Sequence, residues 1–165
     1  MSDTIIKQLS DGILLLTLNR PEKKNAINIP MWHGIRESFN EASAKDEVRV
    51  VVLTGAGKDF CAGVDLGDFG DADEEHPFNS AAEAVANFDK PLLAAAKGVS
   101  VGGGATVLFH ADVVYVGDSL RMRLPFVNLG LVPEWASSYM LQATIGARQA
   151  AELMYTAEWI NAERA

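Results

Sequence analysis

The chain has 165 residues, of which 48% are hydrophobic and 22% are charged, and its formal net charge is −8. This length and composition predict a single globular domain over residues 1–165, and no linker rich in Pro, Gly or Ser divides it. The acidic balance argues against a nucleic-acid partner, because phosphate backbones need a basic surface. The N-terminus shows no signal-peptide pattern and no apolar run is long enough to cross a bilayer, so we expect a cytoplasmic protein with no membrane partner.

The first half of the chain predicts three strands and one helix. Strands are expected at residues 4–9 and 13–18, joined by Asp11-Gly12, which is a favourable pair for a hairpin turn. Pro30 is expected to open a helix of roughly fourteen residues, and residues 48–54 read as a third strand. The apolar residues of the helix fall on one stripe: Met31, Ile35, Phe39 and Ala42.

The second half alternates helices with strands. Helices are expected at residues 81–88, 103–110, 134–144 and 147–155, and strands at 92–96 and 112–116. This order predicts an α/β protein built from repeated strand-strand-helix units. Pro133 fits the first position of a helix, which would place Glu134 in the first turn.

Two glycine-bearing loops follow two predicted buried strands. One runs from Gly55 through Ala62-Gly63-Val64, and the other is the triplet at residues 102–104. Glycines at such places leave backbone N–H groups accessible, and one N–H from each loop, if the fold brings them together, would converge on a single oxygen. Nucleotide motifs fail on spacing, because Phe60 stands where the dinucleotide fingerprint needs glycine and Asp59 stands where a phosphate loop needs Ser or Thr.

The spacing of the cysteine and histidine residues favours neither a thiolate nucleophile nor a metal site. The single cysteine, Cys61, has no histidine near it in sequence, so a small packed apolar residue is favoured over a thiolate nucleophile. His33, His76 and His110 are far apart, and we expect no metal site.

Charged residues cluster in two places. Acids concentrate over residues 65–75, which we interpret as a solvated surface loop. Arg20, Lys23 and Lys24 form a local cationic cluster, which is either an ordinary surface cluster or a contact for a phosphate-bearing ligand.

Several motifs in one order resemble the crotonase (enoyl-CoA hydratase/isomerase) superfamily over nearly the whole chain. They are residues 19–26 (NRPEKKNA), 60–66 (FCAGVDL), 97–98 (KG), 102–104 (GGG) and 111–112 (AD). The resemblance implies a spiral of ββα units with two roughly perpendicular sheets, and assembly into a trimer or hexamer. It also implies an acyl-CoA thioester as substrate, with no cofactor besides the coenzyme A that the substrate carries.

The resemblance assigns roles to the glycine loops. Backbone N–H groups of Val64 and Gly103 are implied to hold the thioester oxygen, and so to stabilise the enolate formed when a proton leaves the neighbouring carbon. Contacts to the substrate and its coenzyme A are expected from Lys23, Lys24, Ala26, Ala62, Gly63, Asp65, Leu66, Gly102, Phe126 and Trp135.

Glu134 is the candidate catalytic base. The two glutamates of enoyl-CoA hydratase are replaced here by Thr106 and Phe126, so two-glutamate hydration is not expected. Residues 124–134 resemble the peroxisomal-type enoyl-CoA isomerases and their bacterial relatives, in which the glutamate of a Leu-Gly-Leu-x-x-Glu segment is the base. One base suffices to move a double bond from C3 to C2 of the acyl chain.

Alternatives remain open at this site. Glu134 at a helix start would stabilise the helix and have a lowered pKa, unless Phe126 and Trp135 desolvate it. The segment 130–139 is also similar to 4-chlorobenzoyl-CoA dehalogenases, in which an aspartate attacks carbon. Trp135 either narrows the acyl pocket or packs elsewhere, and a non-catalytic protein that binds CoA esters is a further possibility. The resemblance implies that the C-terminal helical region is absent, because residues 160–165 match the point where relatives enter it.

Overall fold

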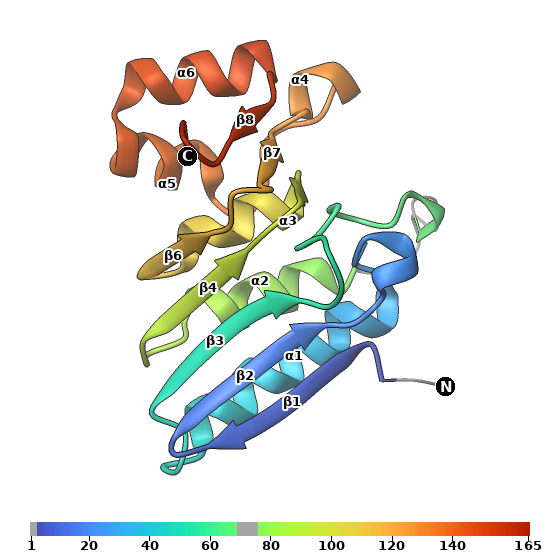
Figure 1. Ribbon diagram of the computed structural model, residues 1–165, viewed down its shortest axis with the longest axis vertical. Helices are drawn as coiled ribbons and strands as arrows, with labels where there is room; N and C mark the ends of the chain where they lie inside the picture. The colour runs from blue at the N-terminus through green and yellow to red at the C-terminus, as the bar shows by residue number, and fades with distance from the viewer. Residues whose placement is uncertain (1–2, 69–75) are drawn as a thin grey trace.

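The computed structural model describes residues 3–68 and 76–165 (Figure 1). Its larger sheet has five strands in the order β1-β2-β3-β4-β6. The strands are β1 (Ile5–Ser10), β2 (Ile13–Leu18), β3 (Val50–Gly55), β4 (Leu92–Ala96) and β6 (Val113–Val116). The predicted acidic loop falls partly on residues 69–75, which lie outside the described residues.

The opening hairpin confirms the sequence-based prediction. Asp11 and Gly12 have φ values of 53° and 82°, the left-handed pair that a tight two-residue hairpin turn requires. β1 pairs antiparallel with β2, and each further neighbouring pair in this sheet is parallel. Parallel neighbours need crossover connections, and helices supply two of them.

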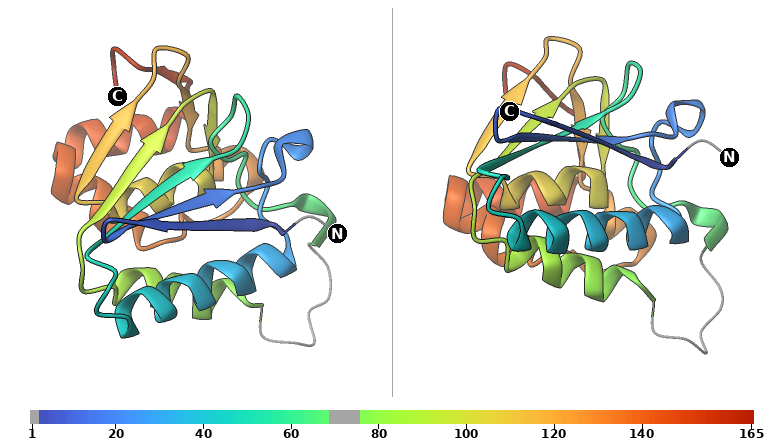
Figure 2. Two further views of the ribbon diagram at one scale, coloured as in Figure 1. Left: turned by 60° about the horizontal axis from the view of Figure 1, so that its bottom comes forward. Right: turned by 90° about the horizontal axis from the view of Figure 1, so that it is seen from below.

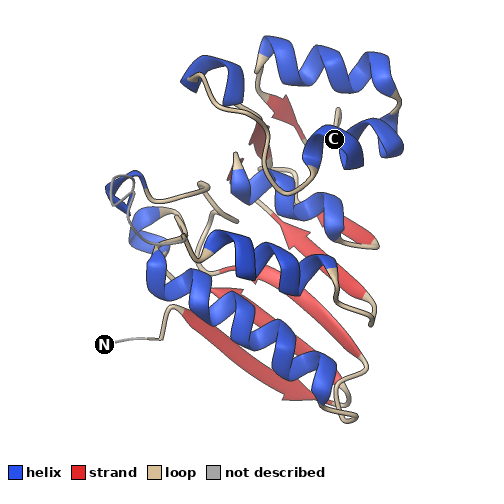
Figure 3. Ribbon diagram, turned by 180° about the vertical axis from the view of Figure 1, so that it is seen from behind, coloured by secondary structure: helices blue, strands red, loops and turns tan. Residues whose placement is uncertain are grey.

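Helices α1 (Ile29–Ala44) and α2 (Phe78–Ala86) are these crossovers, and they cover the same face of the five-stranded sheet (Figures 2 and 3). The Asn28 side chain accepts a hydrogen bond from the N–H of Met31 at 3.2 Å and so caps α1. All four residues of the predicted apolar stripe of α1 are buried, which confirms its orientation.

A second sheet has three strands in the order β5-β7-β8, so the expectation of two sheets is confirmed. Its strands are β5 (Val99–Val101), β7 (Arg121–Arg123) and β8 (Ile160–Asn161). The apolar pattern did not predict these strands, because two or three residues carry no periodicity and their pairing is non-local. Residues 160–161 form a strand, where the resemblance implied the start of a helical region.

The remaining helices differ from prediction at their ends. Predicted helix 103–110 is split into α3 (Gly103–Thr106) and the 3-10 turn η3 (Val107–His110). Predicted helix 134–144 begins only at Ser137, because Trp135 and Ala136 have φ values of 54° and 49°, which no α-helix accommodates. The other elements are η1 (Pro21–Lys23), η2 (Leu66–Asp68), α4 (Phe126–Leu129), α5 (Ser137–Ile145) and α6 (Ala147–Thr156).

The core runs continuously between the sheets and helices. Cys61 is fully buried within it, and burial raises the pKa of its thiol to about 12. The thiolate is therefore scarce at neutral pH, which confirms that Cys61 acts as a small apolar residue. Within the described ranges, the helices are all too short or too polar to cross a bilayer.

Candidate active site

The two glycine loops lie side by side. The loop after β3 runs along β5, where the N–H groups of Phe60 and Cys61 both donate to the carbonyl of Val99, at 3.1 and 3.0 Å. The N–H of Val101 donates back to the carbonyl of Cys61 at 3.0 Å. These backbone bonds position the Ala62-Gly63-Val64 segment against the glycine triplet that follows β5.

This close approach requires glycine at two positions. Gly63 has a φ of 92°, and a Cβ atom there would lie 2.6 Å from the carbonyl oxygen of Val101. A Cβ atom on Gly104 would collide with the carbonyl oxygen of Cys61 and lie 2.7 Å from its Cβ atom. Side chains at either position would push the loops apart, so these glycines serve packing between backbones.

Val64 and Gly103 lie at this junction. Ile27 pairs with the Val64 segment through Gly63 and Asp65, at 2.8 and 2.9 Å, which leaves the Val64 N–H on the other side. Gly103 is the first residue of α3, where helical N–H groups have no intrahelical acceptor. A Cβ atom built on Gly63 lies 3.5 Å from the Gly103 nitrogen, and one built on Gly103 lies 3.9 Å from Cγ2 of Val64.

Glu134 lies at the same junction. Its Oε1 atom is 3.8 Å from the position of a Cβ atom on Gly103, and it accepts a hydrogen bond from Oγ1 of Thr106 at 2.9 Å. The pKa of this carboxyl is raised, mainly because burial disfavours the charged form, while the Thr106 hydrogen bond opposes the rise. The expectation that Glu134 lies in the first turn of a helix is wrong, because α5 begins three residues later.

Thr106, which the resemblance matches to a hydratase glutamate, hydrogen-bonds to Glu134. Its side chain is fully buried in α3, and its hydroxyl lies 3.1 Å from the carbonyl oxygen of Gly102 as well as 2.9 Å from Glu134. A hydroxyl has one hydrogen, so it donates to one of these oxygens at a time.

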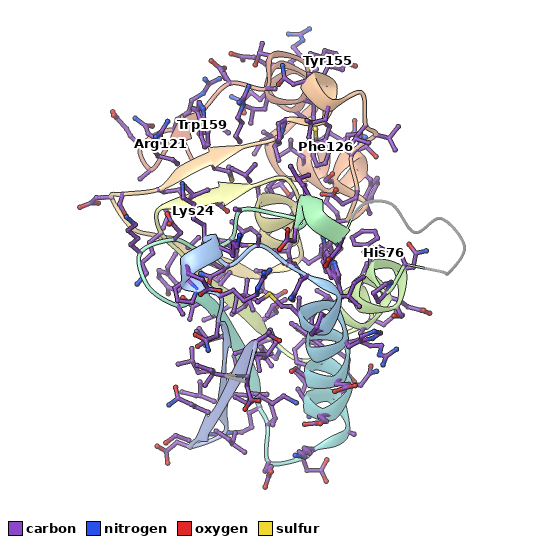
Figure 4. All side chains as sticks on the ribbon, turned by 90° about the vertical axis from the view of Figure 1, so that its right-hand side faces the viewer. Lys24, His76, Arg121, Phe126, Tyr155 and Trp159 are labelled. Atoms are coloured by element: carbon purple, nitrogen blue, oxygen red, sulfur yellow. The ribbon has the colours of Figure 1, made fainter. Side chains whose placement is uncertain are left out.

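Trp135 lies beside Glu134 and is only 3% exposed. Its Nε1 atom is 3.6 Å from the position of a Cβ atom on Gly103. Phe126, predicted with Trp135 to contact substrate, is buried at the start of α4, and Figure 4 shows it above the level of Lys24 and His76.

Direct hydrogen bonds join the residues around Lys24 to those around Ala62, and both groups are predicted to contact coenzyme A. The N–H of Ala62 donates to the carbonyl of Lys24 at 2.9 Å. Arg20 donates to the carbonyl of Ala26 at 2.6 Å and to the carboxylate of Asp65 at 2.9 Å. The hydrogen bond from Arg20 is the main reason that the pKa of Asp65 is lowered. The Arg20 charge is thus paired within the protein, whereas Lys23, Lys24 and Leu66 are exposed.

Sequence reasoning missed the role of Asn25. This residue is fully buried, and its side-chain amide donates to the carbonyls of Ala56 and Asp59 at 2.9 and 2.8 Å. Its side-chain oxygen accepts from the N–H of Arg20 at 2.9 Å. Asn25 also has a φ of 55°, in the left-handed region where asparagine is enriched. This preference of asparagine is the feature of the sequence that could have indicated a special role.

Comparison with known proteins matches residues 8–165 to the family described as enoyl-CoA hydratase/isomerase. The 1,2-epoxyphenylacetyl-CoA isomerase of Escherichia coli is 33% identical over 175 residues, which cover 100% of this chain and 67% of that protein. A probable enoyl-CoA hydratase of Rhodobacter capsulatus is 34% identical, with 98% of this chain and 65% of the relative covered. Enoyl-CoA delta isomerase 2 of Homo sapiens is 38% identical, with 92% and 41% covered.

The fold is shared with solved structures. A protein from Acinetobacter baumannii, described as a putative enoyl-CoA hydratase/isomerase, superposes with a TM-score of 0.92 at 42% identity, covering 100% of this chain and 73% of that one. The chain spans about two thirds of the first two curated relatives. Because the family match covers nearly every residue, the chain belongs to the enoyl-CoA hydratase/isomerase (crotonase) family.

Proposed function

We propose that this protein is an enoyl-CoA isomerase that moves a double bond from C3 to C2 of an acyl-CoA thioester. Glu134 is the base, and the backbone N–H groups of Val64 and Gly103 hold the thioester oxygen. The observation that carries this proposal is the position of the Glu134 carboxylate, whose Oε1 atom is 3.8 Å from the Cβ position of Gly103. A base at that point is adjacent to the carbon atoms that follow a bound thioester carbonyl.

The proposed reaction needs one base and two amide donors. Glu134 removes a proton from C2, and the resulting dienolate carries its negative charge on the thioester oxygen. The two amides stabilise that charge without moving, and the backbone hydrogen bonds between the loops support such a fixed position. The protonated Glu134 then delivers the proton to C4, which leaves the double bond between C2 and C3.

The raised pKa of Glu134 supports the role of base. A carboxylate with a higher pKa binds a proton from carbon more strongly than an exposed one. Thr106 holds Oε1, while Oε2 accepts no hydrogen bond from the described residues, which makes Oε2 the oxygen that takes the proton. Once Oε2 is protonated, Oε1 remains an acceptor, so the Thr106 hydroxyl continues to donate to it.

The test supplies a short 3-enoyl-CoA and measures the absorbance of the conjugated 2-enoyl thioester that is formed. We expect turnover by the wild type, and a loss of about 10²- to 10⁴-fold in kcat for Glu134→Gln, which keeps the shape but cannot accept the proton. Glu83→Gln is the matched control, because Glu83 is an exposed glutamate on α2.

Other outcomes separate the alternatives. Isomerisation that survives Glu134→Gln removes Glu134 from the mechanism. Hydration of a 2-enoyl-CoA without isomerisation indicates a hydratase, and halide release from a haloaryl-CoA indicates a dehalogenase. Binding of CoA esters with no turnover of any of them indicates a non-catalytic binding protein.

A further inference from the structure

Trp135 adopts an unfavourable backbone conformation next to the proposed base. Its φ is 54° and that of Ala136 is 49°, and bulky side chains rarely adopt this left-handed region. Such strain persists only where the surrounding structure imposes it, and it is frequent at functional sites. Here the turn directs the indole into the interior, where Trp135 is 3% exposed.

The indole of Trp135 packs among three rings from separate elements. Its centroid lies 6.2 Å from that of Trp32 on α1, 5.6 Å from Phe78 on α2 and 5.5 Å from His110 on η3. The Nε2 atom of His110 is 2.8 Å from the carbonyl oxygen of Trp135, which fixes the backbone of the turn as well. Trp32, Phe78 and His110 therefore form an aromatic wall that packs against the indole.

The opposite edge of the indole faces the catalytic junction. Its Nε1 atom lies 3.6 Å from the position of a Cβ atom on Gly103, and the Oε1 atom of Glu134 lies 3.8 Å from the same point. An acyl chain that passes Glu134 therefore meets the indole directly.

A solvent-open hollow of about 520 Å³ is bordered by His110, near the end of α2 and the start of β4. Phe88, Lys90, His110, Asp112 and Met140 are among the residues that line it. His110 contacts the indole of Trp135 and also borders this hollow, so it is the residue that the two places share.

We infer that Trp135, supported by His110, is a gate that closes the inner end of the acyl site and restricts this protein to short acyl chains. This inference rests on the proposed function only in taking an acyl-CoA thioester as the ligand. A long chain would have to displace an indole packed against three rings, whereas a short chain ends before it. Removal of the indole would free the space that its rings fill in front of His110.

The test measures affinities for saturated acyl-CoA esters by calorimetry, comparing butyryl-CoA with decanoyl-CoA. These esters lack a double bond, so the result does not depend on isomerase turnover. We expect the wild type to bind butyryl-CoA at least about ten-fold more tightly than decanoyl-CoA. In Trp135→Gly the affinity for decanoyl-CoA relative to butyryl-CoA should rise by at least about ten-fold, since each buried methylene contributes about four-fold in affinity.

Glycine is the substitution of choice because it adopts a φ of 54° without strain, so the turn is retained. Trp135→Leu is the second variant. It keeps an apolar side chain in the wall and should shift the ratio in the same direction by a smaller amount. Trp159→Ala is the matched control, because Trp159 is 43% exposed and stacks on Arg121 at the surface.

The outcomes distinguish this inference from the proposed function. Wild-type binding of decanoyl-CoA as tight as that of butyryl-CoA overturns the gate alone. A shift in both Trp135 variants no larger than in Trp159→Ala also overturns it. If no acyl-CoA ester binds, both proposals fail. If the wild type prefers butyryl-CoA to decanoyl-CoA but does not isomerise 3-enoyl-CoA, only the proposed function is contradicted.

Discussion

The hydroxyl of Thr106 donates a hydrogen bond to Oε1 of Glu134 over 2.9 Å, which joins α3 to the loop before α5. One hydroxyl thus links the helix that carries the proposed oxyanion amide to the proposed base. This hydrogen bond stabilises the carboxylate form of Glu134. It persists when the proton is bound to Oε2, because Oε1 remains an acceptor. This arrangement makes Thr106 a positioning residue for Glu134.

Thr106→Val should raise the pKa of Glu134 further, because it removes the one hydrogen bond that lowers that pKa. The acid limb of the pH profile of kcat/KM should therefore move to higher pH, and kcat should fall about ten-fold because the carboxylate loses its orientation. Thr106→Ser keeps the hydroxyl and should restore both the position of the acid limb and kcat. An acid limb that stays in place in Thr106→Val would exclude this role.

Glu134→Gln should make the folded protein more stable at neutral pH. The folded-state pKa is raised above the ordinary value of 4.5, so ionisation of Glu134 destabilises the fold as pH rises through that range. The melting temperature of Glu134→Gln should exceed that of the wild type by a few degrees at pH 7, and the difference should vanish below pH 4.5. Thermal melts across this pH range measure it, and an equal difference at all pH values would contradict the assigned cause.

Gly104→Ala should separate the two glycine loops. The added Cβ atom meets the backbone and Cβ atom of Cys61, which cannot move without breaking the bonds between the loop and β5. We expect kcat/KM to fall by about 10²-fold, since small misplacements of catalytic groups have effects of this size. Gly117→Ala is the control, because the nearest atom to its Cβ position is 3.4 Å away. Equal activity in both variants would show that the loop junction tolerates displacement.

Asn25→Ala should destabilise the protein by about 3 kcal/mol, because it leaves one buried and two part-buried backbone groups without their hydrogen-bond partner. Urea denaturation gives the free energy of unfolding directly. The control is Asn40→Ala, an exposed asparagine on α1, which should change stability by less than about 0.5 kcal/mol. A loss of similar size in the two variants would mean that the buried amide contributes no more than a surface one.

The sequence by itself determined the features that depend on neighbours in the chain. The Asp11-Gly12 hairpin and the buried stripe of α1 follow from local turn preference and helical spacing, and both are observed. The ordered motifs around the two glycine loops sufficed to identify the family, because close packing of those loops permits few residue types. The motif at residues 124–134 also predicts Glu134 as the base.

Only the tertiary structure decided the features that depend on contacts between distant segments. The strands β5, β7 and β8 exist through pairing across the chain, and the buried amide of Asn25 is recognisable only by its partners. α5 begins at Ser137 and not at the predicted residue 134, because the aromatic contacts and the hydrogen bond with His110 hold Trp135 in the left-handed region. Local helix preference does not predict such contacts. The environment of Glu134, and with it the direction of its pKa shift, is likewise a product of burial among residues remote in sequence.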